Sequence, residues 1–135
     1  MQLIMKLFFL YLSLFGVHTK KLTPEVIKVW EGVVAPYFDD CVKMTNVDPE
    51  IPRTMFELED LPTAESFACY MKCIFEKMSF FNSNNELDQD QMLKSIYMLK
   101  PGELQRCMAE SANQTNVCKK THDISACIIH RVEND

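Results

Sequence analysis

The chain has 135 residues, a length that suits one domain and is too short for two. Its formal net charge is −5 and it has no basic cluster, which argues against nucleic-acid binding because contacts with phosphates require Lys and Arg. Hydrophobic residues make up 47% of the chain and only three residues are glycine, a composition that favours an all-helical domain.

The first segment has the pattern of a secretory signal peptide. Lys6 supplies a positive charge, and residues 7–17 form an apolar run of eleven, too short to span a bilayer. A buried N-terminal helix is the alternative, but the polar sequence HTKK follows the run at once. We therefore expect cleavage after Thr19, with a signal peptide at 1–19 and a secreted domain at 20–135. No later stretch has the length and hydropathy of a membrane span.

Helix-start signals divide the first half of the secreted domain. Thr23 as N-cap and Pro24 at the first helical position predict a helix that Pro36 should kink or split. An Asp-Pro pair at Asp48 predicts one short helix. Thr63 is the expected N-cap of the most periodic segment of the chain.

Three further helices are expected in the second half. One begins near Asp88, after a polar loop, and the next begins at Pro101. The segment NVCKKTHDISACIIHRVE forms the last helix. The sequence therefore predicts an all-α fold of about six helices joined by short polar turns.

The periodic segment after Thr63 has the pattern of a central helix. One of its faces is apolar at helical spacing: Phe67, Tyr70, Met71, Ile74, Phe75 and Met78. Glu65, Lys72 and Glu76 lie on the opposite face, and Cys69 and Cys73 lie beside this charged stripe. We expect the helix to pack through one face and to be covalently bonded to neighbours through the other flank.

All six cysteines lie in the predicted secreted domain: Cys41, Cys69, Cys73, Cys107, Cys118 and Cys127. An even number behind a signal peptide predicts three disulfides, because the secretory route is oxidising. The alternative is zinc held by the i,i+4 pairs Cys69/Cys73 and Cys118/His122. The expected secretion favours disulfides, so no metal and no cofactor are predicted.

Helix geometry narrows the pairing without deciding it. Six cysteines allow fifteen pairings. Cys69 cannot bond Cys73 within one helix, because i,i+4 Cβ atoms lie about 5–6 Å apart and a disulfide needs about 4 Å. Cys118 and Cys127 are nine residues apart, on opposite sides of the last helix. Ten pairings remain.

The cysteine spacing resembles that of one family. Between successive cysteines lie 27, 3, 33, 10 and 8 residues, with the short gaps in CYMKC and CKKTHDISAC. Together with the signal peptide and the helical pattern, this resembles the insect odorant-binding proteins, the pheromone and general odorant-binding group. The resemblance implies the pairs Cys41–Cys73, Cys69–Cys118 and Cys107–Cys127. It also implies a compact helical bundle around an apolar cavity that holds small hydrophobic molecules.

Catalytic patterns are weak or missing in the sequence. Cys118 four residues before His122-Asp123 resembles the active helix of secreted phospholipases A2. However, Lys119 stands where a second cysteine is needed, and the spacing to Cys127 is wrong. Gly32 and Gly102 cannot build the glycine-rich calcium loop of such enzymes. We therefore predict no enzyme activity and interpret His122 and Asp123 as helix-surface residues.

Candidate wall residues of the cavity come from the central helix and nearby apolar positions. Methionine is frequent in the chain, and its flexible side chain suits cavities that accept varied ligands. A plain hydrophobic core is the alternative for the same residues. The predicted ligand-binding residues are Phe56, Phe67, Met71, Ile74, Phe75, Met78, Phe80, Ile96, Tyr97 and Ile128.

Two polar positions carry further predictions. Asn113 begins the sequon Asn-Gln-Thr and is a candidate N-glycosylation site. His122, at the edge of the apolar side of the last helix, is a candidate pH switch for ligand release, because the ordinary pKa of histidine, about 6.5, lies near mild acidification. His130 is expected to be a solvated bystander.

The predicted function is that of a secreted, chemosensory-type carrier. It would bind a small apolar molecule and transport it through extracellular fluid. The alternative is a secreted interaction protein on the same scaffold, for example a salivary, venom or reproductive-fluid component, which needs no deep cavity. A receptor or a second copy of the chain is left open as a further partner.

Overall fold

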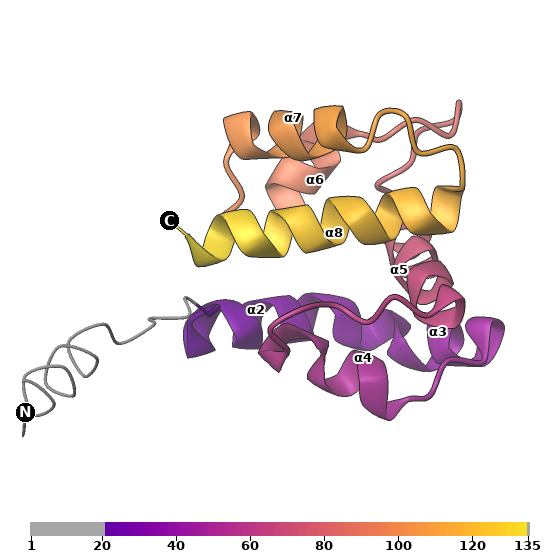
Figure 1. Cartoon of the computed structure of the whole chain (residues 1–135). Helices are drawn as coiled ribbons and strands as arrows, with labels where there is room; N and C mark the ends of the chain where they lie inside the picture. The colour runs from indigo at the N-terminus through magenta and orange to yellow at the C-terminus, as the bar shows by residue number, and fades with distance from the viewer. Residues whose placement is uncertain (1–20, 135) are drawn as a thin grey trace, which may run out of the picture.

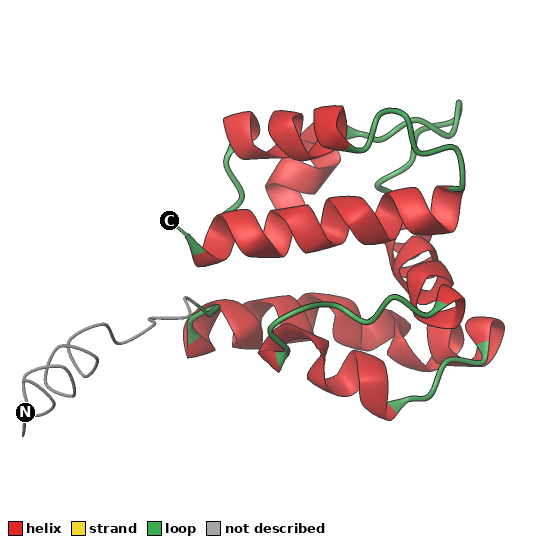
Figure 2. Ribbon diagram, viewed as in Figure 1, coloured by secondary structure: helices red, strands yellow, loops and turns green. Residues whose placement is uncertain are grey.

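The computed structural model describes residues 21–134, so the predicted signal peptide at 1–19 lies outside the described residues. The described part is helical, with loops and no named strand (Figure 2). In chain order its elements are α2 (Pro24–Val34), the 3-10 helix η1 (Ala35–Tyr37), α3 (Phe38–Thr45), α4 (Glu50–Thr54), the 3-10 helix η2 (Met55–Glu57), α5 (Glu65–Lys77), α6 (Gln89–Ser95), α7 (Pro101–Glu110) and α8 (Val117–Glu133).

The first helix begins and breaks where the sequence predicts. Thr23 Oγ1 accepts a hydrogen bond from the backbone N–H of Val26 at 3.4 Å, and Pro24 occupies the first turn. Pro36 lies in η1, between α2 and α3. When α2, η1 and α3 are taken as one broken helix, the described residues form six helices, the predicted number.

The later helix starts agree with the sequence except at α5. Asp88 caps α6 by accepting from Gln91 N at 3.0 Å, and Pro101 lies in the first turn of α7. Helix α5 begins at Glu65 without a side-chain cap, so the predicted N-cap role of Thr63 is wrong. The carboxylate of Glu65 in the first turn provides the favourable charge at this helix end instead.

Helix α8 runs across the middle of the molecule, with α6 and α7 on one side and α2, α3 and α4 on the other (Figure 1). Helix α5 packs against α8 and α3, which gives it the predicted central position. Its buried residues include Phe67, Tyr70, Ile74 and Phe75, all from the apolar face. The core therefore lies where α5 and α8 meet the layer formed by α2 to α4.

The three disulfides are those implied by the family resemblance. Cys41–Cys73 joins α3 to α5, Cys69–Cys118 joins α5 to the start of α8, and Cys107–Cys127 joins α7 to α8. All six cysteines are therefore bonded to one another and are not ligands of a metal. Helix α8 is attached to different neighbours on its two sides, as the spacing of its cysteines predicts.

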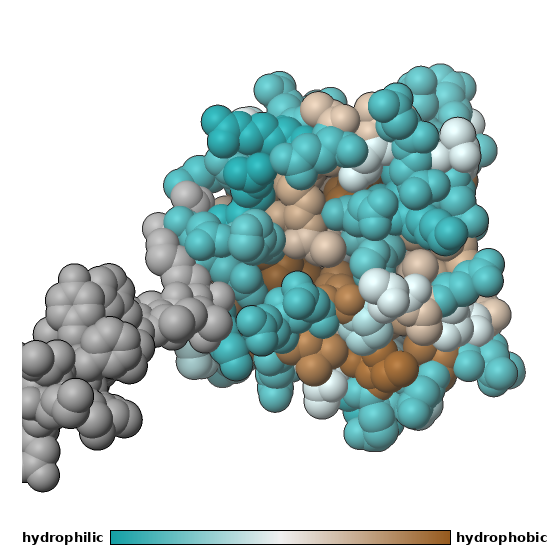
Figure 3. All heavy atoms as spheres, viewed as in Figure 1, coloured by the Kyte–Doolittle hydropathy of each residue, from teal (hydrophilic) through white to brown (hydrophobic). Residues whose placement is uncertain are grey.

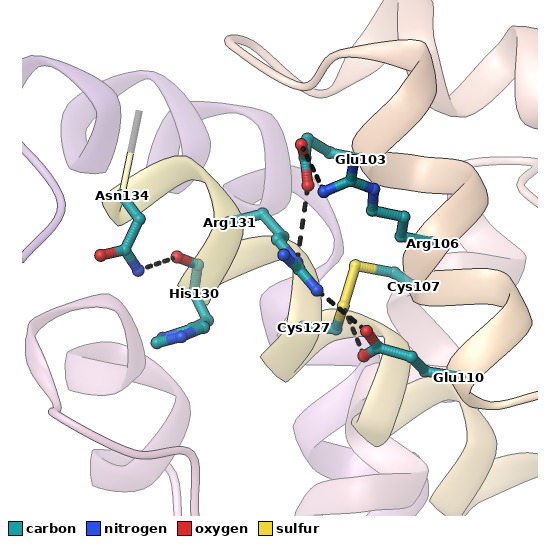
Figure 4. Close-up of polar contacts among 8 residues, drawn as sticks. All are labelled: Glu103, Arg106, Cys107, Glu110, Cys127, His130, Arg131 and Asn134. Atoms are coloured by element: carbon teal, nitrogen blue, oxygen red, sulfur yellow. Dashed lines mark hydrogen bonds and ion pairs between the residues drawn. A yellow bond between two sulfur atoms is a disulfide. The ribbon is translucent and has the colours of Figure 1, made fainter.

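Charged side chains reinforce the contact between α7 and α8 (Figure 4). Arg131 of α8 points between two acidic residues of α7. Its Nη2 donates to Glu110 Oε1 at 2.9 Å, and its Nε lies 3.5 Å from Glu103 Oε2. Because these contacts lie beside Cys107–Cys127, the second half of α8 is held to α7 by a covalent bond and two ion pairs.

No helix among the described residues is long and apolar enough to cross a membrane.

Candidate ligand cavity between α2, α5 and α8

An apolar cavity of about 70 Å³ lies where the two sides of the molecule meet. In Figure 3, hydrophobic side chains are visible between α8 and the layer of α2 and α4. The cavity is lined by Trp30, Val33, Val34, Met55, Phe56, Met71, Ile74, Phe75, Met78, Phe80, Ser95, Ile96, Ser125, Ile128 and Ile129. None of these side chains is charged, so the wall offers an apolar ligand dispersion contacts and little competition from water.

Helical periodicity places much of the wall. On α5, Met71, Ile74 and Phe75 follow one another at i, i+3 and i+4 and therefore share a face. On α8, the corresponding positions are Ser125 and Ile128, with Ile129 beside them. Helices α5 and α8 pack against each other and are joined by Cys69–Cys118, so these two faces lie on adjacent sides of the cavity.

Eight of the ten predicted ligand-binding residues line this cavity. They are Phe56, Met71, Ile74, Phe75, Met78, Phe80, Ile96 and Ile128. Phe67 does not line it: this residue is fully buried in solid core, and its ring stacks on Tyr70 at a centroid distance of 6.1 Å. Whether any wall residue contacts a ligand stays a prediction.

Tyr97 also lies away from the cavity, because its segment is no longer helical. Helix α6 ends at Ser95 and the backbone of Ile96 is extended, so consecutive side chains point to opposite sides. Ile96 faces the cavity, while the exposed Tyr97 hydroxyl donates to Glu25 Oε1 at 3.1 Å. This hydrogen bond and the charge of Glu25 raise the pKa of Tyr97.

Seven wall residues were not predicted from the sequence: Trp30, Val33, Val34, Met55, Ser95, Ser125 and Ile129. The α2 members could have been found, because Val26, Trp30 and Val33 recur at i, i+4 and i+7 on one face of that helix. The serines could not, since hydropathy patterns do not single out a hydroxyl that faces a cavity.

Trp30 fixes the α2 side of the cavity. Its indole Nε1–H donates to the backbone carbonyl of Tyr97 at 3.0 Å. Its ring meets that of Phe56 edge to face, with centroids 5.5 Å apart. The residue is only 6% exposed. The indole therefore connects α2 to η2 and to the segment after α6, three parts of the chain that carry no mutual disulfide.

Two hydroxyl groups give the wall its limited polarity. Ser125 Oγ donates to the carbonyl of Thr121 at 2.8 Å, so its proton is already used while a lone pair remains. Ser95 Oγ accepts from Gln91 Nε2 at 3.5 Å. A hydroxyl also carries one proton to donate, and among the described residues no acceptor for that of Ser95 is found. The cavity can therefore exchange at most a few hydrogen bonds with a ligand.

The structure changes the interpretation of the His-Asp pair on α8. Asp123 is exposed, as expected, but only 12% of the His122 side chain is exposed. Its Nε2 lies 2.9 Å from the carbonyl oxygen of Pro62, and its Nδ1 lies 3.3 Å from Asp123 Oδ1. His122 is thus not a surface residue, because the segment before α5 covers it. It does not line the cavity.

Asn113 and His130 are accessible. Asn113 is exposed in the turn that follows α7, and the side chain of His130 on α8 is 75% exposed. Glycosylation at Asn113 stays a prediction.

The family model of the PBP/GOBP family matches residues 31–131. This range includes all six cysteines and most of the cavity wall. The chain therefore belongs to the PBP/GOBP family, the insect pheromone-binding and odorant-binding proteins, as the cysteine spacing indicates. Members of this family are binding proteins. No curated protein and no solved structure gives a significant match to the chain.

Proposed function

We propose that this protein is a secreted carrier that takes up one small hydrophobic molecule in its internal cavity and transports it through extracellular fluid. The observation that carries the proposal is a cavity without charged wall residues, lined mainly by α2, α5 and α8, in a member of the PBP/GOBP family. Moving apolar ligand surface from water into such a cavity is favourable by about 25 cal/mol per Å². No step of this function requires catalysis or a cofactor.

The covalent framework supports secretion. Three disulfides form and persist in oxidising compartments such as the secretory route, and they are rare in the cytosol. One of them, Cys69–Cys118, joins α5 to α8, two of the helices that carry the cavity wall. The signal peptide at 1–19 and the secreted domain at 20–135 belong to this proposal.

The wall indicates the chemistry of the ligand. Among the described residues that line the cavity, Ser95 and Ser125 are the ones with hydroxyl groups. A buried charge without a partner is costly, and no charged wall residue provides one. We therefore propose a ligand that is mostly hydrocarbon, with one or two neutral oxygen atoms at most.

A matched pair of substitutions on α2 tests the carrier function. Val33 lines the cavity and Val29 does not, although both are on the same helix one turn apart. Val33→Phe should fill part of the cavity and weaken binding of an apolar fluorophore by about tenfold or more, the scale of one or two methylene groups in an apolar pocket. Val29→Phe, at a position that is 37% exposed, should leave binding unchanged.

The rival function predicts a different result. A secreted interaction protein that acts through its surface would show no saturable uptake of the fluorophore, and Val33→Phe and Val29→Phe would behave alike. Saturable binding of one fluorophore per chain, weakened only by Val33→Phe, favours the carrier. A receptor or a second copy of the chain remains compatible with either function.

We also propose that Asn113 carries an N-linked glycan. Its exposure in the turn after α7 supports access by the glycosylation machinery, and it does not line the cavity. Glycosidase treatment of secreted material should lower its mass, and Asn113→Gln should abolish the shift without changing ligand binding. An unchanged mass after treatment would contradict the proposal.

A further inference from the structure

The cavity is smaller than a typical ligand site. Its volume is about 70 Å³, whereas ligand pockets usually measure about 300–1,000 Å³. A ligand larger than a few atoms fits inside this volume only if a wall side chain moves. The question is therefore which residue moves and what space its movement opens.

A surface groove of about 460 Å³ lies directly beside the cavity. It runs between the α2–α3 segment and the α4–η2 segment. Val34 and Phe56 line both the groove and the cavity. These two side chains therefore form a partition between the cavity and the groove.

Of the two, Phe56 is the side chain that can move. Val34 is branched at Cβ and sits at the end of a regular helix, which leaves it few rotamers. Phe56 lies in the 3-10 helix η2, is half-buried, and belongs to a stretch between Cys41 and Cys69 that contains no cysteine. Its ring contact in the partition is the edge-to-face pair with Trp30.

The far end of the groove has a different character from the cavity. Phe38 provides an apolar surface there, and the guanidinium of Arg53 lies 5.3 Å from the centre of its ring. Glu31 and Asp39 are exposed at the rim, so both signs of charge are present. A neutral polar group can remain hydrated at this end while the attached chain contacts Phe38.

We infer that Phe56 determines which ligands this protein accepts. Displacement of its ring joins the cavity to the groove and creates one elongated site. Such a site fits a linear molecule whose hydrocarbon end lies between α5 and α8 and whose neutral polar end lies near Arg53. The groove supplies the additional length that the cavity of about 70 Å³ lacks. This inference rests on the proposed carrier function and adds the residue that sets ligand length.

The inference is tested with straight-chain primary alcohols of increasing length, which compete with an apolar fluorophore. Phe56→Ala should shift the preferred chain to greater length and raise the affinity of long alcohols relative to short ones by about tenfold. It should also speed fluorophore association in stopped-flow mixing. Phe56→Leu, which keeps an apolar side chain, should show a smaller shift and serves if the alanine variant does not fold.

Phe81→Ala is the matched control, because Phe81 is half-buried but lines neither the cavity nor the groove. Its chain-length profile should equal that of the wild type. If the wild type binds alcohols but the Phe56 variants match the control, the role of Phe56 is overturned and the carrier function stands. If the wild type binds neither fluorophore nor alcohol, the carrier function itself fails.

Discussion

The indole N–H of Trp30 donates a hydrogen bond to the backbone carbonyl of Tyr97, which is 67 residues away in the sequence. The bond joins α2 to the segment that follows α6 at the edge of the cavity. Trp30→Phe removes the donor and leaves that carbonyl without it, so we expect the free energy of unfolding to fall by about 1–3 kcal/mol. The midpoint of urea unfolding measures this loss.

Tyr97→Phe is the control for the Trp30 prediction. It removes the exposed hydroxyl that donates to Glu25 but keeps the carbonyl that Trp30 contacts. An exposed substitution of this kind usually changes stability by less than about 0.5 kcal/mol. If the free energy of unfolding fell equally in the two variants, the indole hydrogen bond would not contribute measurably to stability.

A second prediction concerns Tyr70 on α5. Its hydroxyl is buried and has no hydrogen-bond partner among the described residues, and burial raises the pKa of Tyr70 to about 12. An unpaired buried polar group costs about 1–3 kcal/mol, so Tyr70→Phe should stabilise the protein by about 1 kcal/mol. Thermal unfolding at pH 7 tests this, with Tyr37→Phe as the control.

The same group gives a dependence of stability on alkaline pH. The pKa of Tyr70 in the folded state is above its unfolded value of 10. The folded state therefore binds the proton of the Tyr70 hydroxyl more tightly than the unfolded state does. The stability that this difference contributes is complete below pH 10 and is lost as pH rises toward 12. Tyr70→Phe should lose less stability across this interval than the wild type. If the stability of the two proteins fell equally between pH 10 and pH 12, the raised pKa of the buried Tyr70 hydroxyl would be contradicted.

Glu133 at the end of α8 provides a prediction at acidic pH. Burial raises its pKa, with smaller contributions from His130, which lowers it, and from Asp60 and Glu59, which raise it. Because the pKa of Glu133 is higher in the folded state, protonation of its carboxyl group stabilises the folded state. This stabilisation is complete below the unfolded pKa of 4.5 and is lost as pH rises through the folded pKa.

Glu133→Gln removes the carboxylate whose burial is unfavourable at neutral pH. We therefore expect its melting temperature to exceed that of the wild type by more at pH 7 than at pH 4. Glu57→Gln, at an exposed position in η2, should show no such difference. A larger advantage at pH 4 would reverse the sign and refute the prediction.

Ligand release by protonation of His122 stays a prediction. The ring is 12% exposed; its charged and polar neighbours are Asp123 and the Pro62 carbonyl, and the ring of Phe67 meets it edge to face. Both ring nitrogens face oxygen atoms and the ring does not line the cavity, so an effect on binding would have to pass through the segment that precedes α5. We expect an apolar fluorophore to bind less tightly at pH 5 than at pH 7.

Two variants isolate the histidine responsible. His122→Gln can still donate to Pro62 but cannot become charged, so it should flatten the difference between the two pH values. His130→Gln, on the exposed side of the same helix, should keep the difference. Equal affinity of the wild type at pH 5 and pH 7 would end the idea.

The sequence predicted the fold well because its signals are local. Proline and N-cap residues mark helix starts, and the cysteine spacing identifies a family whose disulfide pattern the structure contains. The start of α5 was the exception: no side chain caps it, and the carbonyl of nearby Pro62 contacts His122, a partner that is 60 residues away.

The site was predictable only in part. Sequence periodicity identifies the apolar face of a helix, but it does not say whether a residue on that face packs in the core or lines a cavity. Phe67 and Phe75 lie on the same apolar face of α5, yet Phe75 lines the cavity and Phe67 is enclosed in solid core. The wall contributed by Trp30 depends on how α2 approaches α8. The position of Phe56 between cavity and groove is likewise a tertiary property that no local pattern encodes.

Trp30 also offers the most direct test of the carrier function, because it is the only tryptophan of the chain and it lines the cavity. Titration with a non-fluorescent straight-chain alcohol should change the intrinsic emission of Trp30 in a saturable way, reaching a plateau at one molecule per chain. Val33→Phe should weaken this response and Val29→Phe should preserve it. An emission that stays constant, or that drifts linearly without saturation, would contradict ligand binding in this cavity.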